Sequence, residues 1–316
     1  MRALAKWLGI FFFGAASAFG QSLHPEAKLD APVPIRAAVT CKAGAEIVGV
    51  GEDGAIYAWT PPASTPRKMS VADGPVSEID CAEGDTLAAG LRHGKKVVIL
   101  DARSGEVRQR INPQAPIQYL ALSPDGGLLA IATSLLPTQL WNTRTGTRIA
   151  TGVTNVGAAW TTAFSPTGEM YVAADEDTNL RAYDRNGNLL YAADGGMLEP
   201  FALAFSGNGK QFAAAGADGV IRIFDSGSGK LMASSTSVGH PIFALAMSPD
   251  GQQVASFSVD DFRLDPLGLG VWDVRSNDSK PLAVEAKSCV GMGASKSHVL
   301  LVTKDGEKTL QVSSLQ

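Results

Sequence analysis

Residues 242–273 read IFALAMSPDGQQVASFSVDDFRLDPLGLGVWD, and this stretch contains the elements that decide the fold. Two apolar runs flank the turn sequence Ser248-Pro249-Asp250-Gly251, and a third run ends at Trp272-Asp273. Glycine readily adopts the positive φ that many tight turns need, and proline fixes the φ of a residue within them. Short aliphatic runs separated by such turns predict an antiparallel sheet.

The end of this unit, an aromatic or aliphatic residue usually followed by Asp or Asn, recurs along the whole chain. Successive anchors lie 41, 41, 42, 41, 48 and 40 residues apart, which is the spacing of propeller blades. The anchors are Trp59, Leu100-Asp101, Trp141-Asn142, Tyr183-Asp184, Phe224-Asp225, Trp272-Asp273 and Val312. Seven anchors predict seven blades.

Each unit contains four strand signals. In the third unit, residues 117–122 lead into a turn at 123–126, and residues 128–133, 139–141 and 147–151 supply three more strands. The predicted fold is therefore all-β: a seven-bladed β-propeller made of four-stranded antiparallel blades.

The last unit has no fourth strand of its own, because the sequence ends soon after its third. Residues 26–33 precede the first strand of unit one and stand where a fourth strand would. Their Pro32-Val33 step recurs at Pro75-Val76. We expect this N-terminal strand to pair with residues 309–313 and close the ring, which leaves only short, protected edges.

The pattern resembles the WD-repeat propeller family over nearly all of residues 36–316, and most closely in the sixth unit. In that family a His, a Ser or Thr, an Asp and a Trp form a structural hydrogen-bond chain within one blade. The resemblance implies this role for His240, Ser256, Asp260 and Trp272. The other units lack the full set and look like the degenerate propellers common in secreted bacterial proteins.

Residues 1–20 have the character of a secretory signal peptide. Arg2 and Lys6 flank the start of an apolar run at 7–13, and small residues follow that suit cleavage. The alternative is a membrane anchor, but a membrane span needs roughly 20 apolar residues. We therefore expect a single propeller domain over residues 21–316. It would be periplasmic or extracellular, with no membrane insertion of the mature chain.

The composition excludes two classes of protein. Apolar residues make up 45% and charged residues 18%, which is typical of a chain with a sizeable core rather than a disordered one. The net charge is only −4, and no long basic run is present. Binding to nucleic acid is therefore not expected.

Three cysteines are present, and none lies in a Cys-x-x-Cys motif. Cys41 and Cys81 end the innermost strands of units one and two, which are neighbours in a ring, whereas Cys289 begins that of unit seven. A disulfide between Cys41 and Cys81 would suit an oxidising compartment. The alternative is a pair of buried free thiols.

The innermost strands line the channel of a propeller, and here they are mostly small and apolar. Glu78 and Asp80 are their only charged residues. A catalytic site needs a base, a charge stabiliser and usually a metal that converge on one point. The sequence shows no such convergence, and the four histidines lack metal-ligand spacing. We expect no catalysis, no cofactor and no metal.

Two acidic stretches allow a second interpretation. Residues 175–179 and the group Asp260, Asp261 and Asp265 contain the oxygen ligands that Ca²⁺ prefers. Neither stretch has the ligand spacing of a regular calcium loop. Solvated turns are the preferred interpretation.

The resemblance to WD-repeat propellers implies a partner-binding patch on the face formed by the loops between strands four and one and between strands two and three. Aromatic and apolar side chains gather in these segments, and such residues anchor interfaces. The candidate residues are Leu135, Leu136, Trp160, Phe201, Phe243, Phe262, Leu264 and Leu267.

These candidates fall into two groups. Phe262, Leu264 and Leu267 lie in the extra residues of unit six, on what the spacing predicts to be a long exposed loop. The aromatic residues that begin three inner strands have an alternative role, which is to fill the core between blades. Phe243, for example, is in phase with Leu245 and Met247.

The functional prediction is an exported, non-catalytic platform that binds another protein in the cell envelope. One alternative is a propeller enzyme, such as a lactonase-like hydrolase or a quinoprotein-like subunit. Converging carboxylates in the channel, or a metal, would favour it. The other is a small-ligand-binding ring, which repeated surface aromatics on every blade would favour.

Overall fold

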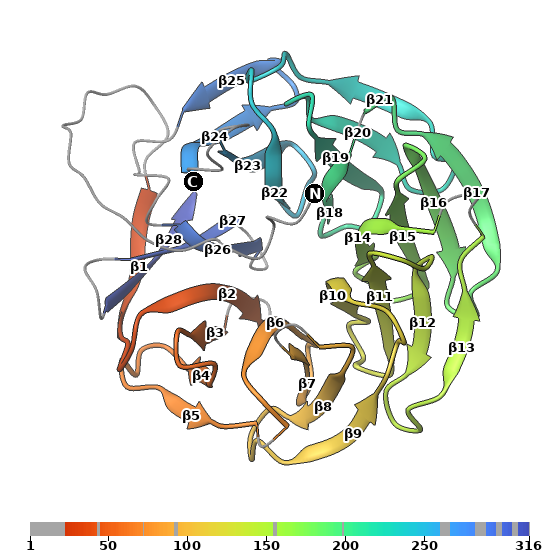
Figure 1. Cartoon of the computed structure of the whole chain (residues 1–316). Coiled ribbons are helices and arrows are strands. Elements are labelled where there is room, and N and C mark those ends of the chain that lie inside the picture. The colour runs from red at the N-terminus through yellow and green to blue at the C-terminus, as the bar shows by residue number, and fades with distance from the viewer. Residues whose placement is uncertain are drawn as a thin grey trace.

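The computed structural model describes residues 23–315 except 43–44, 72, 92–93, 154–156, 198, 260–265, 282–288, 295–298 and 305–308. These residues form seven four-stranded antiparallel sheets, arranged as blades around a central axis (Figure 1). The predicted all-β seven-bladed propeller is confirmed. The predicted signal peptide lies outside the described residues. No helix in the described part of the chain is long and apolar enough to cross a membrane.

The inner strand of each blade faces the axis, and the outer strand lies at the rim. Blades one to three comprise β2 (Ile35–Cys41), β3 (Glu46–Gly51), β4 (Ile56–Trp59) and β5 (Arg67–Met69); β6 (Val76–Cys81), β7 (Thr86–Leu91), β8 (Val97–Asp101) and β9 (Val107–Ile111); and β10 (Ile117–Leu122), β11 (Leu128–Thr133), β12 (Gln139–Asn142) and β13 (Arg148–Thr151). Blades four and five comprise β14 (Ala159–Phe164), β15 (Met170–Asp175), β16 (Asn179–Asp184) and β17 (Leu189–Asp194); and β18 (Pro200–Phe205), β19 (Gln211–Gly216), β20 (Arg222–Asp225) and β21 (Leu231–Ser234). Blades six and seven comprise β22 (Ile242–Met247), β23 (Gln253–Val259), β24 (Pro266–Asp273) and β25 (Asp278–Pro281); and β26 (Cys289–Ala294), β27 (Val299–Lys304), β28 (Thr309–Leu315) and β1 (Leu23–Asp30).

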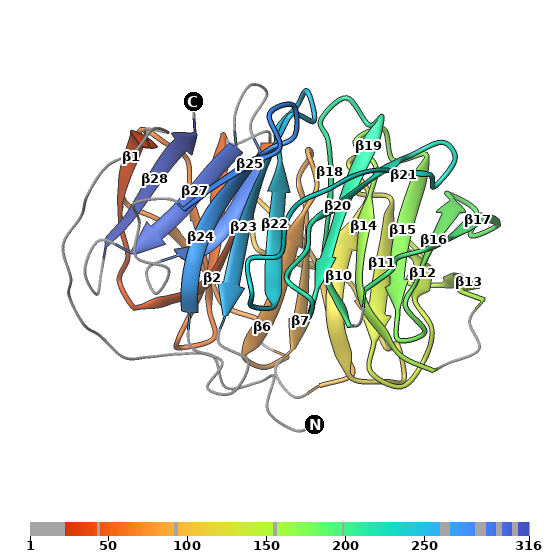
Figure 2. The same ribbon diagram turned by 90° about the horizontal axis from the view of Figure 1, so that it is seen from above.

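The ring closes as predicted, because β1 supplies the outer strand of the blade that β26, β27 and β28 begin. It pairs antiparallel with β28, so that Leu29 lies opposite Leu310 and Asp30 opposite Thr309. The two strands lie side by side in both views, although they come from opposite ends of the chain (Figures 1 and 2). The Trp59 indole of blade one donates a 2.8 Å hydrogen bond to the Asp30 carbonyl. This bond ties the closing strand to the next blade.

The turns between inner and second strands explain why Ser, Asp and Gly recur in the sequence. In blade three the Gly126 amide donates to the Ser123 carbonyl (2.8 Å), and the Leu128 amide donates to the Ser123 hydroxyl oxygen (2.9 Å). The Ser123 hydroxyl in turn donates to the Asp125 carboxylate. Gly126 has φ of 70°, a conformation that favours glycine.

The hydrophobic core is divided among the contacts between neighbouring blades. Successive side chains on a strand point to opposite faces. On β7, Leu87 therefore packs with residues of blade one and Ala88 with residues of blade three, and both are fully buried. The described apolar residues form seven such clusters, one at each junction between adjacent blades. Strands buried on both faces explain the continuous apolar runs in the sequence.

A disulfide joins the inner strands of blades one and two. Cys41 and Cys81 end β2 and β6, and their Cα atoms lie 5.8 Å apart. The covalent link spans 40 residues of chain and fixes one blade to the next at the channel wall. It is the arrangement that the positions of the two cysteines predicted.

Removing this disulfide should destabilise the ring. By restricting the unfolded chain, a link of this span is worth roughly 2–4 kcal/mol. Replacing Cys41 and Cys81 together by Ser should lower the melting temperature, and a reductant should bring the wild-type protein to the same value. Cys289→Ser is the control and should leave the response to reductant unchanged. A wild-type melting temperature that does not respond to reductant would contradict the disulfide.

Ring closure predicts a large effect from one residue of β1. The Leu29 side chain is fully buried with Leu310 and Val312 of β28 and with blade one. Leu29→Ala should reduce the free energy of unfolding by about 2–4 kcal/mol, because it leaves a cavity at the closing junction. Glu26→Ala, on the exposed side of the same strand, should change it by less than about 0.5 kcal/mol. Urea unfolding measures both, and equal stability of the two variants would contradict the closure.

Candidate functional site

Every inner strand carries a β-bulge at its second residue. The register shifts in each blade at this point, so that one residue has no partner on the second strand. Such a bulge bends the strand and re-aims a side chain. The seven bulged residues are Arg36, Ser77, Gln118, Trp160, Phe201, Phe243 and Val290.

Three of these bulged residues form an aromatic row across blades four to six. The rings of Trp160 and Phe201 meet edge to face at 5.3 Å between centroids, and those of Phe201 and Phe243 stack at 4.3 Å. All three are partly exposed, and none belongs to the clusters between blades in the described core. The structure thus brings the three side chains into contact with one another, outside those clusters. The bulge between Ile242 and Ala244 leaves Phe243 without a partner on the second strand, and both Phe243 and Leu245 border the channel.

The central channel contains a cavity of about 230 Å³ beside this row. Residues of six inner strands line it, and most of them are small or aliphatic. Four side chains give it its chemical character. These are Glu78 of β6, Tyr119 of β10, Phe201 of β18 and Phe243 of β22.

Glu78 has no group among the described residues that would offset the negative charge of its carboxylate. Burial raises its pKa from 4.5 to about 7. Within the described residues, no side chain or backbone group donates a hydrogen bond to its carboxylate or forms an ion pair with it. The nearest cationic bulged residue, Arg36, instead donates to the carbonyls of Gly51 (3.2 Å) and Val76 (3.0 Å).

Two further titratable groups, Asp80 and Tyr119, lie near Glu78, and Tyr119 lines the cavity with it. Asp80 accepts a 2.7 Å hydrogen bond from the Leu122 amide, and burial raises its pKa to about 6. Burial also raises the pKa of Tyr119, and the carboxylates of Asp80 and Glu78 raise it further. Tyr119 still exposes 45% of its surface, because it borders the open space of the channel. The channel wall at blades two and three is therefore acidic.

The structure describes three of the four residues of the hydrogen-bond chain implied for blade six. The Trp272 indole donates to the Asn277 side chain (3.1 Å), in the turn that follows β24. His240 is exposed, whereas Ser256 is buried. Asp260 lies outside the described residues. Asn277, in a nearby turn, therefore accepts the indole hydrogen bond that the family pattern assigns to a residue in the blade interior.

Two carboxylates of the acidic stretch in blade four form ion pairs within the blade. Asp175 and Asp177 both pair with Arg181, at 2.7 Å and 2.5 Å. Burial raises the pKa of Asp175 to about 6, whereas the Arg181 hydrogen bond lowers the pKa of Asp177. Asp175 and Asp177 are therefore both paired with an arginine of their own blade. Among the described residues, no three His, Cys, Asp or Glu side chains lie together in a way that could hold a metal ion.

The remaining predicted partner-binding residues are placed unequally. Leu135 lies in the loop after β11 and is 62% exposed, whereas Leu136 is partly buried and its backbone bonds to the Thr133 hydroxyl. Phe262 and Leu264 lie outside the described residues. Leu267 belongs to strand β24, so the extra residues of unit six are not all loop. The longer spacing of unit six predicted a loop here, but part of the extra length extends the third strand of the blade.

Large exposed apolar side chains gather on blades three to five. Five of them lie on the outer strands β13, β17 and β21: Ile149, Leu189, Leu190, Leu231 and Met232. We call these five residues the apolar flank. Sequence analysis missed the flank, although its signal was present: these strands begin RI, LL and LM, whereas the equivalent strands of blades one and two begin RK and VR.

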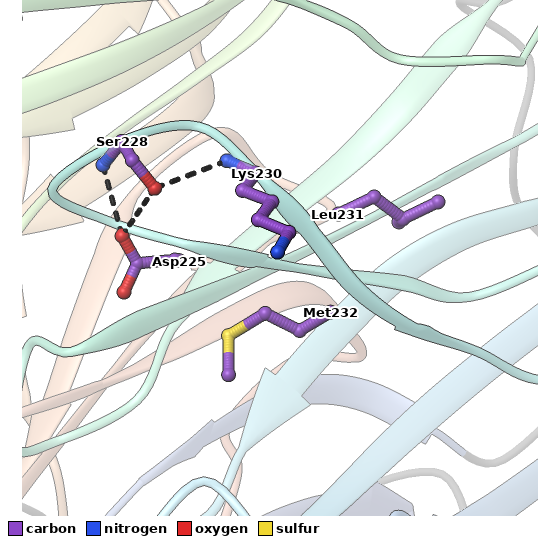
Figure 3. Close-up of a pocket in the computed structure, with 5 residues that line it drawn as sticks. All are labelled: Asp225, Ser228, Lys230, Leu231 and Met232. Atoms are coloured by element: carbon purple, nitrogen blue, oxygen red, sulfur yellow. Dashed lines mark hydrogen bonds between the residues drawn. The ribbon is translucent and has the colours of Figure 1, made fainter.

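One end of the flank borders a shallow hollow. Asp225, Ser228, Lys230, Leu231 and Met232 line it (Figure 3). The Asp225 carboxylate accepts hydrogen bonds from the Ser228 amide and hydroxyl, so that the turn is held by its own side chains. Leu231 and Met232 are left as the apolar part of this surface.

Residues 162–254 are similar to the anaphase-promoting complex subunit 4 WD40 domain, and this segment runs from blade four into blade six. The match covers less than a third of the chain. No curated protein matches the chain significantly. The match and the seven-bladed ring together show a WD-repeat-like propeller.

The grouping of Glu78 with Tyr119 was not predicted. Both residues directly follow the bulged position of their strands, which places them at equivalent heights on neighbouring blades. Their spacing of 41 residues, equal to one repeat, is the signal that could have found the pair.

Glu78 predicts a particular dependence of stability on pH. Its carboxyl stays protonated in the folded protein up to about pH 7 but ionises near 4.5 when unfolded. The folded state thus binds the extra proton between these values, and the free energy of unfolding falls as pH rises through them. Glu78→Gln should remove this part of the decline and be roughly 1–3 kcal/mol more stable than wild type at pH 8.

Urea unfolding at pH 5 and pH 8 tests this prediction. Glu83→Gln is the matched control, because Glu83 is an exposed carboxylate on the turn that follows β6. It should follow the wild-type curve. Parallel pH curves for Glu78→Gln and wild type would show that the Glu78 carboxylate is not buried as described.

Proposed function

We propose that this protein is an exported interaction platform that binds another protein in the cell envelope and catalyses no reaction of its own. The WD40 similarity supports the proposal, because propellers of that kind commonly mediate protein–protein interactions. Since one fold serves many functions, the argument has to rest on a particular surface of this chain.

The apolar flank is the observation that carries the proposal. Outer strands are exposed edges, and proteins usually protect such edges with charged side chains. Blades one and two follow this rule with Lys68 on β5 and with Arg108 and Arg110 on β9. Blades three to five instead present leucine, isoleucine and methionine on three consecutive rim strands (Figure 1). An exposed apolar surface of this kind is typical of an interaction site.

Two features support export. The Cys41–Cys81 disulfide is the kind of bond that persists in an oxidising compartment. Residues 1–20 carry the charged, apolar and small-residue segments of a signal peptide. Both are consistent with a periplasmic or extracellular protein.

The chemistry of the channel favours binding over catalysis. Its two carboxylates lie on one strand, and Asp80 is already engaged by the Leu122 amide. A catalytic site would need a base and a charge stabiliser aimed at a common point.

The experiment is affinity capture of the tagged mature protein from its own cell envelope, read by mass spectrometry. The variant Leu190→Ser/Met232→Ser makes the centre of the flank polar, and both side chains are 53% exposed, so the fold should be retained. The control is Lys95→Ser/Lys96→Ser, at exposed positions of blade two. We expect a partner that the control retains and the flank variant loses. A partner retained equally by both variants would show that the flank is not the binding surface.

A further inference from the structure

We propose that the channel cavity binds an organic cation, an ammonium or guanidinium group on a short aliphatic stem, between Glu78 and the rings of Phe201 and Phe243. This site is separate from the apolar flank and does not depend on the proposed platform function. The side chains that line the cavity, a carboxylate and aromatic rings, are what indicate a cationic ligand.

The size and shape of the cavity suit such a group. A volume of about 230 Å³ holds one side chain of the size of lysine or arginine rather than a folded segment. The aliphatic part of the lining comes from Ala37, Val39, Leu203, Leu245 and Met292. These side chains would pack against the stem of the ligand and exclude water around its charged end.

The aromatic lining suits a positive charge. Aromatic faces attract cations within about 6 Å, and the attraction grows when water is excluded. Phe201 and Phe243 stack at 4.3 Å, too close to admit a ligand between them, so their remaining surfaces are the ones that border the cavity. Tyr119 of blade three supplies a third ring to the lining.

The charge of the cavity is the second, independent observation. Glu78 is partly buried at the edge of the cavity, and an ionised carboxylate withdrawn from water without a partner is unfavourable, so proteins normally pair it. Glu78 has no such partner in the described chain, and its neighbours Asp80 and Tyr119 add negative or neutral polar groups. The other lining residues, from β2, β18, β22 and β26, contain no titratable side chain. A bound cation would supply the missing compensation.

The binding test uses purified mature protein and four probes. The probes are n-butylammonium, n-butylguanidinium, the neutral n-butanol, and a blocked Ala-Arg-Ala tripeptide, each titrated at pH 8 and followed by calorimetry or by NMR shifts. We expect at least one cationic probe to bind, and butanol to bind at least about tenfold more weakly, because it lacks the charge-assisted hydrogen bond to Glu78. If only the tripeptide binds, the natural ligand is a peptide side chain. If the small cations bind equally well, it is a free amine or guanidine.

Two variants locate the site. Glu78→Gln should weaken cation binding at least about tenfold, and Phe243→Leu should weaken it about fivefold. Glu83→Gln should leave binding unchanged. Because the Glu78 carboxyl must ionise to bind a cation, wild-type affinity should rise between pH 5.5 and pH 8, and this rise should vanish in Glu78→Gln. Should that variant fail to fold, the wild-type pH profile still tests the proposal.

The outcomes separate clearly. The proposal is overturned if no cation binds, if butanol binds as well as the cations, or if affinity is independent of both pH and Glu78. None of these results bears on the partner captured through Leu190 and Met232, so failure of the cation site and failure of the platform function are distinguishable.

Discussion

The pairing of β1 with β28 is the interaction on which the rest of the structure depends. Each blade buries both of its faces against neighbours, so an open chain of blades would leave two apolar faces in water. The strand that closes the ring comes from the other end of the sequence, and its Leu29 is buried at the last junction. The Cys41–Cys81 disulfide reinforces one junction, but closure is what completes all seven.

The same architecture determines what the channel can contain. Seven inner strands converge on a narrow space, which small residues such as Ala202 and Ala244 fill without closing it. The bulge in every inner strand frees one side chain from the alternation of the sheet. In blades four to six these freed side chains are aromatic, while an unpaired carboxylate, Glu78, lies on the other side of the ring. The seven blades thus repeat one backbone pattern, whereas the side chains that line the channel differ from one side of the ring to the other.

The repeat spacing predicted the fold, the blade number, the closing strand and the neighbouring positions of Cys41 and Cys81, because all of these follow from a period near 41 residues. Features that depend on side-chain competition were not predictable in this way. Asn277 accepts the hydrogen bond of the Trp272 indole, and Arg181 forms ion pairs with two carboxylates of the acidic stretch. The bulge at Phe243 is a backbone irregularity that apolar periodicity cannot reveal.

Native-state hydrogen exchange in low concentrations of denaturant tests the closure most directly. If the closing pair is an integral part of one cooperative ring, the backbone amides of β1 and β28 exchange only when the whole propeller unfolds. Their exchange then shows the same free energy and denaturant dependence as the amides of β11 and β15. Exchange of β1 and β28 at much lower free energy, with the other blades still protected, would show that the ring is stable without its closing strand and would contradict the account.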